Sequence, residues 1–408
     1  MDETAGVAVQ RGQALLDLGR AREAEEQFRT ALAAAPGEPT LHALLAHALL
    51  RQQRFEEAHD ASRTAVGAAP EHVMAYSTLA ASLVGLKRLP EAEDAVRHAL
   101  ALAPEASVLH VQQAHVLLAQ DRPADALVSI GRARALDPED SDAAAVQAAA
   151  LFEAHRYEES EAAVDEALRL DPENVDAHRI RGLLALRRGG GEPAVQAHRT
   201  ALRLSPTDSD AREGLSVALK SRNPLYGLML RYSMWLRTLP TGLRLLVLFL
   251  PFILTRVLRP FDGETWASVL IVVVVAAVVV SWSLEPLMNC VLLLSRERHL
   301  LGRAARLSTY DFLGFAAAAL VVLIAGLNNG LDQLLTLALG LCLWAMATGS
   351  AHTIRADRRK ILTIGARVAA VVAVIAFAGT VSGVGGLTVA VTAVFLSGIA
   401  ATWFTVFA

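Results

Sequence analysis

Small and apolar residues recur along the first half of the chain with a spacing of 34 residues. Prolines mark this period at Pro36, Pro70, Pro104, Pro138, Pro172 and Pro206. Further ladders of Ala, Leu and Gly keep the same spacing and begin at Gly12, Leu15, Ala24 and Ala31. Each unit is rich in residues that favour helices, and its proline ends a helix. The pattern predicts six units, each a pair of helices that approach closely at their small residues.

This period and these ladders resemble the tetratricopeptide repeat, which implies an all-α, right-handed helical solenoid. The first unit matches most fully, with Gly12, Leu15, Ala24, Phe28, Ala31 and Pro36. The family's early aromatic position instead holds Ala8, His42, Tyr76, His110, Ala144 and His178, and the sixth unit has glycines at 189–191. The predicted repeats are 5–38, 39–72, 73–106, 107–140, 141–174 and 175–208. Residues 209–221 are predicted to cap the array, because the end of a solenoid needs a closing face.

The resemblance also implies that the first helix of each repeat lines a concave face that binds a protein or peptide. The corresponding positions are Val9, Gln13, Ala43, His47, Ser77, Val111, His115, Ala145 and Arg179. Val9 and Gln13 stand where chaperone-binding relatives carry Lys and Asn, which disfavours binding of a chaperone tail. A packed inner wall without a fixed ligand stays open as the alternative.

Histidines recur two repeats apart at His42, His110 and His178. Helix layers stack about 8–10 Å apart, whereas every ligand of a zinc ion lies about 2 Å from it. These side chains therefore cannot meet at one metal, and we expect structural roles for them.

Apolar runs separated by short breaks make up residues 241–408. The run at 267–284 holds eighteen uncharged, mainly apolar residues, which suffice to cross the hydrocarbon core of a bilayer. A polytopic bundle of six spans is predicted at about 242–259, 266–284, 310–327, 333–350, 361–381 and 387–407. The first span depends on Arg244 and Arg256 extending to the membrane surface, because its apolar run at 245–255 is short and contains Pro251.

The distribution of basic residues predicts the orientation of these spans. The breaks at 296–306 and 355–360 carry four basic residues each, and the alternate breaks at 328–332 and 379–386 carry none. Basic loops favour the cytoplasm, which places the array and the C-terminus there. The hairpin with Arg256 and Arg259 argues the other way, and failure of 245–255 to span would put the array outside. The first ten residues lack the apolar segment of a signal peptide, which favours the cytoplasm. High Arg and Ala contents suggest a bacterial inner membrane.

Residues 223–240 predict an amphipathic helix between the two halves. One face carries Leu225, Leu228, Met229, Tyr232, Trp235, Leu236 and Leu239. Aromatic and basic side chains suit the headgroup region of a bilayer, so the expected anchors are Tyr226, Arg231, Tyr232, Trp235 and Arg237. The alternative is a last solenoid helix that packs on the array.

Charge is divided unevenly along the 408 residues, whose formal net charge is −3. Residues 1–220 carry 34 acidic and 23 basic residues, a net charge of −11, and residues 221–408 carry a net charge of +8. An acidic array is unsuited to nucleic acid. The two cysteines exclude a disulfide scaffold. The only serine near an intramembrane-protease pattern is Ser350, whose nearest histidine, His352, is on the same segment.

These features predict a membrane-anchored scaffold that binds a protein or peptide partner, without catalysis, cofactor or metal. The alternative is a transport or flippase-like membrane domain regulated by the array. A polar cavity between the spans would favour transport, and an intramembrane enzyme would need paired polar residues deep in the spans.

Overall fold

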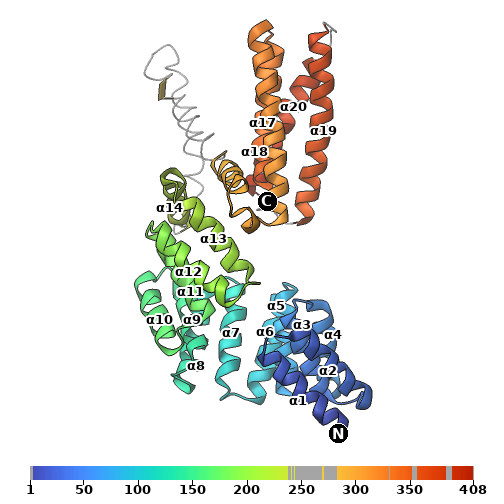
Figure 1. Cartoon of the computed structure of the whole chain (residues 1–408), viewed down its shortest axis with the longest axis vertical. Coiled ribbons are helices and arrows are strands. Elements are labelled where there is room, and N and C mark those ends of the chain that lie inside the picture. The colour runs from blue at the N-terminus through green and yellow to red at the C-terminus, as the bar shows by residue number, and fades with distance from the viewer. Residues whose placement is uncertain are drawn as a thin grey trace. The chain divides into compact units, whose positions relative to one another are not determined.

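The computed structural model describes residues 3–237, 240, 243, 269–270, 283–329, 331–351, 356–382 and 388–407. These ranges form helices joined by short turns and contain no β-strand, as the sequence predicts (Figure 1). The chain divides into two compact units, Met1–Leu184 with Gln196–Asp208 and Ala185–Val195 with Ser209–Ala408. The predicted domain boundary after residue 222 stays a prediction.

Each of the six repeats forms two helices. The first helices are α1 (Glu3–Asp17), α3 (Pro39–Arg51), α5 (Val73–Gly85), α7 (Ser107–Ala119), α9 (Ser141–Glu153) and α11 (Val175–Arg187). The second helices are α2 (Ala21–Ala34), α4 (Phe55–Ala68), α6 (Leu89–Leu102), α8 (Pro123–Leu136), α10 (Tyr157–Leu170) and α12 (Gly191–Leu204). The 34-residue pattern therefore predicted the helices of the array correctly.

The small-residue ladders form the contacts between these helices. Two ladders on the second helices are completely buried: Ala24, Ala58, Ala92, Ala126, Ser160 and Ala194, and Ala31, Ala65, Ala99, Ala133, Ala167 and Ala201. Small side chains at these positions let the backbones approach, and larger side chains such as Phe28 and Ile130 fill the remaining space.

The turn between the two helices has the same backbone geometry in all six repeats. One residue in each turn takes a positive φ between 60° and 81°: Gly19, Gln53, Lys87, Asp121, His155 and Gly189. The following amide closes the turn onto the first helix, as in the 3.0 Å bond from Arg54 N to Leu49 O. The glycines of the sixth repeat thus keep the backbone geometry of the other five.

The second unit contains the long apolar helices. Its helices are α13 (Ser209–Ser221), α14 (Pro224–Arg237), Ser283–Leu294, the 3₁₀ helix η2 (Arg298–Leu300), α17 (Arg303–Asn329), α18 (Asp332–Gly349), α19 (Ala356–Val381) and α20 (Thr388–Phe407). Helices α17 to α20 run alongside one another (Figure 1), and α18 is central because it packs against the other three. Leu334 and Leu337 of α18 are fully buried in the shared core.

Within the part of the chain that the structure describes, three helices are long and apolar enough to cross a membrane, over Arg303–Asn328, Asp332–Gly349 and Arg358–Val381. They coincide with the predicted spans at 310–327, 333–350 and 361–381. Helix α20 coincides with the predicted span at 387–407, and its apolar stretch Thr388–Thr402 is shorter. The runs at 242–259 and 266–284 lie almost wholly outside the described residues, so the count of six stays a prediction.

Candidate partner-binding wall

The first helices of successive repeats form a continuous row, since α3 packs against α5, α5 against α7 and α7 against α9. Six of the nine predicted binding residues lie on this row, Val9 and Gln13 lie on α1, and Arg179 lies on α11. The nine differ in exposure. Gln13, His47 and His115 are exposed, and Val9, Ser77 and Arg179 are half-buried. Ala43, Ala145 and Val111 are 0%, 1% and 7% exposed, so they pack inside the wall and leave little side chain for a partner.

A polar pair joins the wall between the third and fourth repeats. Ser77 Oγ donates to Gln112 Oε1 at 2.9 Å, and Gln112 Nε2 donates to the Ser77 carbonyl at 2.7 Å. Gln112 was missed in the sequence, where it stands beside the apolar Val111. This pair fixes two adjacent first helices to each other.

Charged side chains gather on the wall in the last three repeats. Arg179 Nη2 lies 2.5 Å from Asp176 Oδ1, and Asn174 Nδ2 donates to Asp142 Oδ1 at 2.8 Å. Burial raises the pKa of Asp142, and the nearby carboxylates of Asp140 and Asp176 raise it further. The wall is therefore crowded with negative charge at this end.

His115 lies within the electrostatic reach of this charged group. Its side chain keeps exposed surface, yet protein atoms near the ring reduce its hydration. This desolvation lowers the pKa of His115, and Arg179 lowers it further, against the opposing effect of Asp176. The charged form of His115 is therefore disfavoured.

The tetratricopeptide repeat family matches residues 15–64, 43–107, 111–174 and 146–209. Residues 15–209 are tetratricopeptide repeats. Among solved structures, PilF of Pseudomonas aeruginosa is 22% identical over 52% of this chain and 96% of its own, with a TM-score of 0.40. PilW, a type IV pilus biogenesis factor, is 16% identical over 53% of this chain and 100% of its own, with a TM-score of 0.44. A tetratricopeptide protein of Thermus thermophilus is 22% identical over 53% of this chain and 98% of its own, with a TM-score of 0.32. No curated protein matches the chain.

The recurrent histidines have the same structural role in three tetratricopeptide repeats. The Nε2 atoms of His42, His110 and His178 donate to the carbonyls of Pro36, Pro104 and Pro172 at 2.9, 2.9 and 3.0 Å. Each bond ties a first helix to the proline turn that precedes it. Within the described ranges, no three His, Cys, Asp or Glu side chains form a group that could hold a metal.

A second periodic feature of the repeats was missed in the sequence. In the first five repeats, an arginine immediately before the second helix pairs with an acidic residue three positions later. The pairs are Arg20–Glu23, Arg54–Glu57, Arg88–Glu91, Arg122–Asp125 and Arg156–Glu159. The 34-residue spacing of these pairs is visible in the sequence. The sixth repeat has Gly190 and Pro193 at the two positions instead.

Helix α14, which follows the repeats, places its predicted anchors in different surroundings. Tyr226 is 4% exposed, and its hydroxyl donates to Glu285 Oε2 at 2.8 Å, while Lys220 Nζ lies 2.6 Å from Glu285 Oε1. Burial and the Glu285 carboxylate raise the pKa of Tyr226. Tyr226 therefore contributes to internal packing.

The other predicted anchors of α14 lie outward where they are described. Arg231 is exposed, and Tyr232 and Trp235 are 45% and 50% exposed, with ring centroids 5.9 Å apart. Leu225 and Leu228 extend this exposed apolar stripe. The side chain of Arg237 lies outside the described residues. Contact of the stripe with a bilayer stays a prediction.

Proposed function

We propose that the chain is a membrane-anchored scaffold whose tetratricopeptide array holds a cationic segment of a partner protein. The segment binds along the wall of the first helices, mainly in repeats four to six. The six-span helical domain and the stripe of α14 hold the array at a bacterial inner membrane, with the array and the C-terminus in the cytoplasm. The mechanism is binding, and it needs no cofactor.

The observation that carries this proposal is the in-register array over residues 15–209, with polar side chains exposed along one row of helices. Repeat solenoids offer extended concave surfaces on which a partner can lie. Gln13, His47 and His115 supply hydrogen-bonding groups on that surface, and the buried alanines between them keep it rigid.

Electrostatics supports a cationic partner. The array carries a net charge of −11, and the carboxylates of Asp142 and Asp176 are close enough to raise the pKa of Asp142. A lysine or arginine side chain beside them relieves this repulsion and gains attraction. The same charge repels the phosphate backbone of nucleic acid.

The apolar helices of the second unit support the membrane anchor. Helices α17, α18 and α19 have the length and hydropathy of membrane spans, and basic residues adjoin their ends at 296–306 and 355–360. The predicted spans at 242–259 and 266–284 complete the proposed topology. Basic residues on one side of the bundle favour the cytoplasmic side for both loops.

The test is photo-crosslinking in native membranes from a probe placed at the exposed position His115, in the fourth repeat of the full chain. We expect a partner that crosslinks to the parent chain to be lost from Asp142→Asn/Asp176→Asn. It should persist in the control Asp60→Asn/Asp94→Asn, which removes two carboxylates from the second helices α4 and α6. The crosslink should also weaken as the salt concentration rises.

Equal crosslinking by both double variants would overturn the proposed wall. If Asp142→Asn/Asp176→Asn retains the partner and a small molecule copurifies with the chain, the results favour the alternative, a transport domain regulated by the array.

A further inference from the structure

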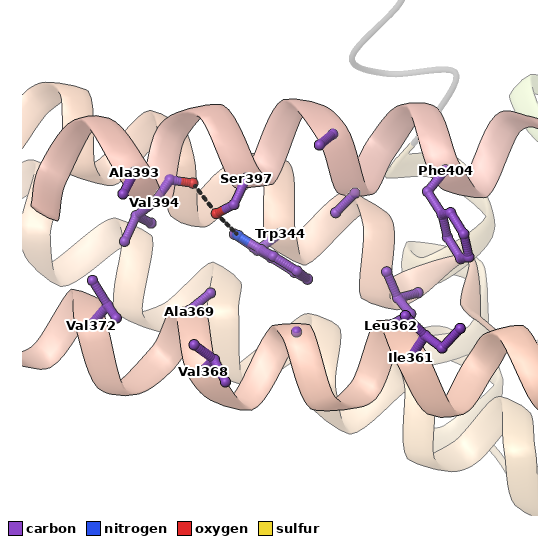
Figure 2. A pocket seen from close by; sticks show the side chains of 13 residues that line it. Trp344, Ile361, Leu362, Val368, Ala369, Val372, Ala393, Val394, Ser397 and Phe404 are labelled. Carbon is purple, nitrogen blue, oxygen red and sulfur yellow. Dashed lines mark hydrogen bonds between the residues drawn. The ribbon is translucent and has the colours of Figure 1, made fainter. Parts of the chain in front are cut away.

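A groove opens between α19 and α20 over the indole of Trp344, which belongs to α18 (Figure 2). Its volume is about 520 Å³, and its walls are almost entirely Ala, Val, Leu, Ile and Phe side chains. The two polar side chains of the lining are both hydrogen-bonded within the protein. Trp344 Nε1 donates to Ser397 Oγ at 3.2 Å, and Ser397 Oγ donates to the Val394 carbonyl at 3.0 Å. The groove thus presents an apolar surface.

The sizes of a few residues create this groove. Helices α18 and α20 meet closely at glycines, since a Cβ on Gly340 would lie 3.0 Å from the Phe395 backbone and one on Gly398 would lie 3.0 Å from the Gly340 carbonyl. The Trp344 ring also lies against Gly365 of α19, where a Cβ would be 3.1 Å from it. The indole lies between α19 and α20 here, and the small side chains that line the space beside it, such as Ala369 and Ala400, leave the groove open.

We propose that this groove binds one acyl chain of an anionic phospholipid, whose phosphate lies at Arg358 and Lys360. The proposal rests on the membrane insertion of these helices and is independent of the partner of the array.

The length of the groove fits one acyl chain. Its lining on α19 extends from Ile361 to Val372, which is about 16 Å along the helix. That distance is about half of the ~30 Å hydrocarbon core, the depth of one leaflet. An acyl chain needs no hydrogen bonds, which suits walls whose polar groups are already paired.

Positive charge lies at one end of the groove. Ile361, Leu362 and Phe404 line this end, and the exposed side chains of Arg358 and Lys360 are on the turn of α19 that precedes it. Arg359 is turned inward, where its Nε donates to the Ala351 carbonyl at 3.0 Å. Basic residues between membrane helices at the cytoplasmic side recognise anionic head groups.

The test is native mass spectrometry of the full chain in detergent, with added phosphatidylglycerol or phosphatidylcholine of identical acyl chains. Two basic residues predict about a thirtyfold preference for phosphatidylglycerol. Arg358→Gln/Lys360→Gln should abolish the preference, whereas the control Arg303→Gln/Arg306→Gln, at the start of α17, should keep it.

A second pair of variants tests the acyl chain. Ala400→Phe places a ring in the groove and should lower the occupancy of both lipids about tenfold, since two or more methylenes lose their burial. Val374→Phe makes a similar change on the outer face of α19 and should have no effect; Val374 is 69% exposed. Unchanged occupancy in Ala400→Phe, or unchanged preference in Arg358→Gln/Lys360→Gln, overturns the proposal. Competition by glycerol phosphate as strong as that by the lipid would assign the site to a soluble phosphate and overturn it too.

Discussion

Facing residues of the repeat helices are matched in size. Gly12 and Gly182 face the rings of Phe28 and His198, where an added Cβ would come within 2.5 and 2.4 Å of ring atoms. The other repeats have alanine at the glycine position and smaller partners, Ser62, Val96, Ile130 and Val164. Because the interior is close-packed, a large ring is accommodated only beside a glycine.

Gly182→Ala should therefore destabilise the array. The new methyl overlaps the His198 ring, which is 0% exposed and has little room to move. Overpacking of this kind costs about 2 kcal/mol. Thermal unfolding followed by circular dichroism measures the loss. The control is Gly131→Ala in α8, where a Cβ meets nothing within 4 Å, and the higher helix propensity of alanine should raise stability. A lower melting temperature for both variants would contradict this interpretation.

His198 should also make the array sensitive to acid. Burial, together with the nearby positive charge of Arg179, lowers the pKa of His198 from 6.5 to about 4. The unfolded chain takes up a proton below pH 6.5 and the folded chain only near 4, so stability is present above 6.5 and is lost as the pH falls through this window. The loss is about 3 kcal/mol.

The variant His198→Phe isolates this effect, because the Gly12–Phe28 pair of the first repeat shows that a phenyl ring fits beside glycine at this position. Melting temperatures from pH 7 to pH 4.5 should fall more steeply for the parent chain than for His198→Phe. Parallel curves would show that another group carries the acid sensitivity.

At the scale of helices and turns, every repeat has one residue with a positive φ in the turn between its two helices. This residue is a glycine in two repeats and another residue type in the other four. Lys87 is exposed, and its φ of 62° is a conformation that L side chains adopt at a cost of about 1 kcal/mol. Lys87→Gly should raise the melting temperature of the array, and Lys87→Val should lower it, since a branched Cβ tolerates this conformation least. The opposite order would show that the Lys87 side chain has stabilising contacts that outweigh the backbone.

The helices of the array could be predicted from sequence because the contacts that define them recur every 34 residues. Short-range ion pairs such as Arg88–Glu91 recur with the same 34-residue spacing. The apolar ladders predict the same helices without them. The contact of Tyr226 with Glu285 joins residues 59 positions apart in segments without a repeat. Nothing in the local pattern distinguishes a tyrosine that is buried against a carboxylate from one at a membrane surface. The exposure of wall residues also depends on how neighbouring repeats pack against them. The position within the repeat therefore predicts Ala43 and Ala145 as binding residues, although packing buries both.

At the scale of the whole molecule, the compact units do not coincide with the two halves of the sequence. Helix α13, predicted to cap the array, belongs to the unit that holds the apolar helices. Its Lys220 side chain is 5% exposed and pairs with Glu285 of the Ser283–Leu294 helix. Tyr226 of α14 shares that carboxylate and packs with Leu284 and Met288. A buried charge pair therefore joins helices on both sides of the predicted boundary.

Removing one partner of this pair should loosen the second unit. Lys220→Met leaves Glu285 without its buried cation, and the cost is about 2 kcal/mol, reduced from that of a fully buried pair because the Glu285 side chain is 30% exposed. Lys220→Met/Glu285→Gln removes both charges and should recover part of the loss, because no uncompensated charge remains. Arg222→Gln breaks the exposed pair with Glu192 and should cost well under 1 kcal/mol. Scanning fluorimetry of the full chain in detergent measures all three. If the double variant is no more stable than Lys220→Met, the Lys220 side chain stabilises the unit by packing, and its charge contributes little.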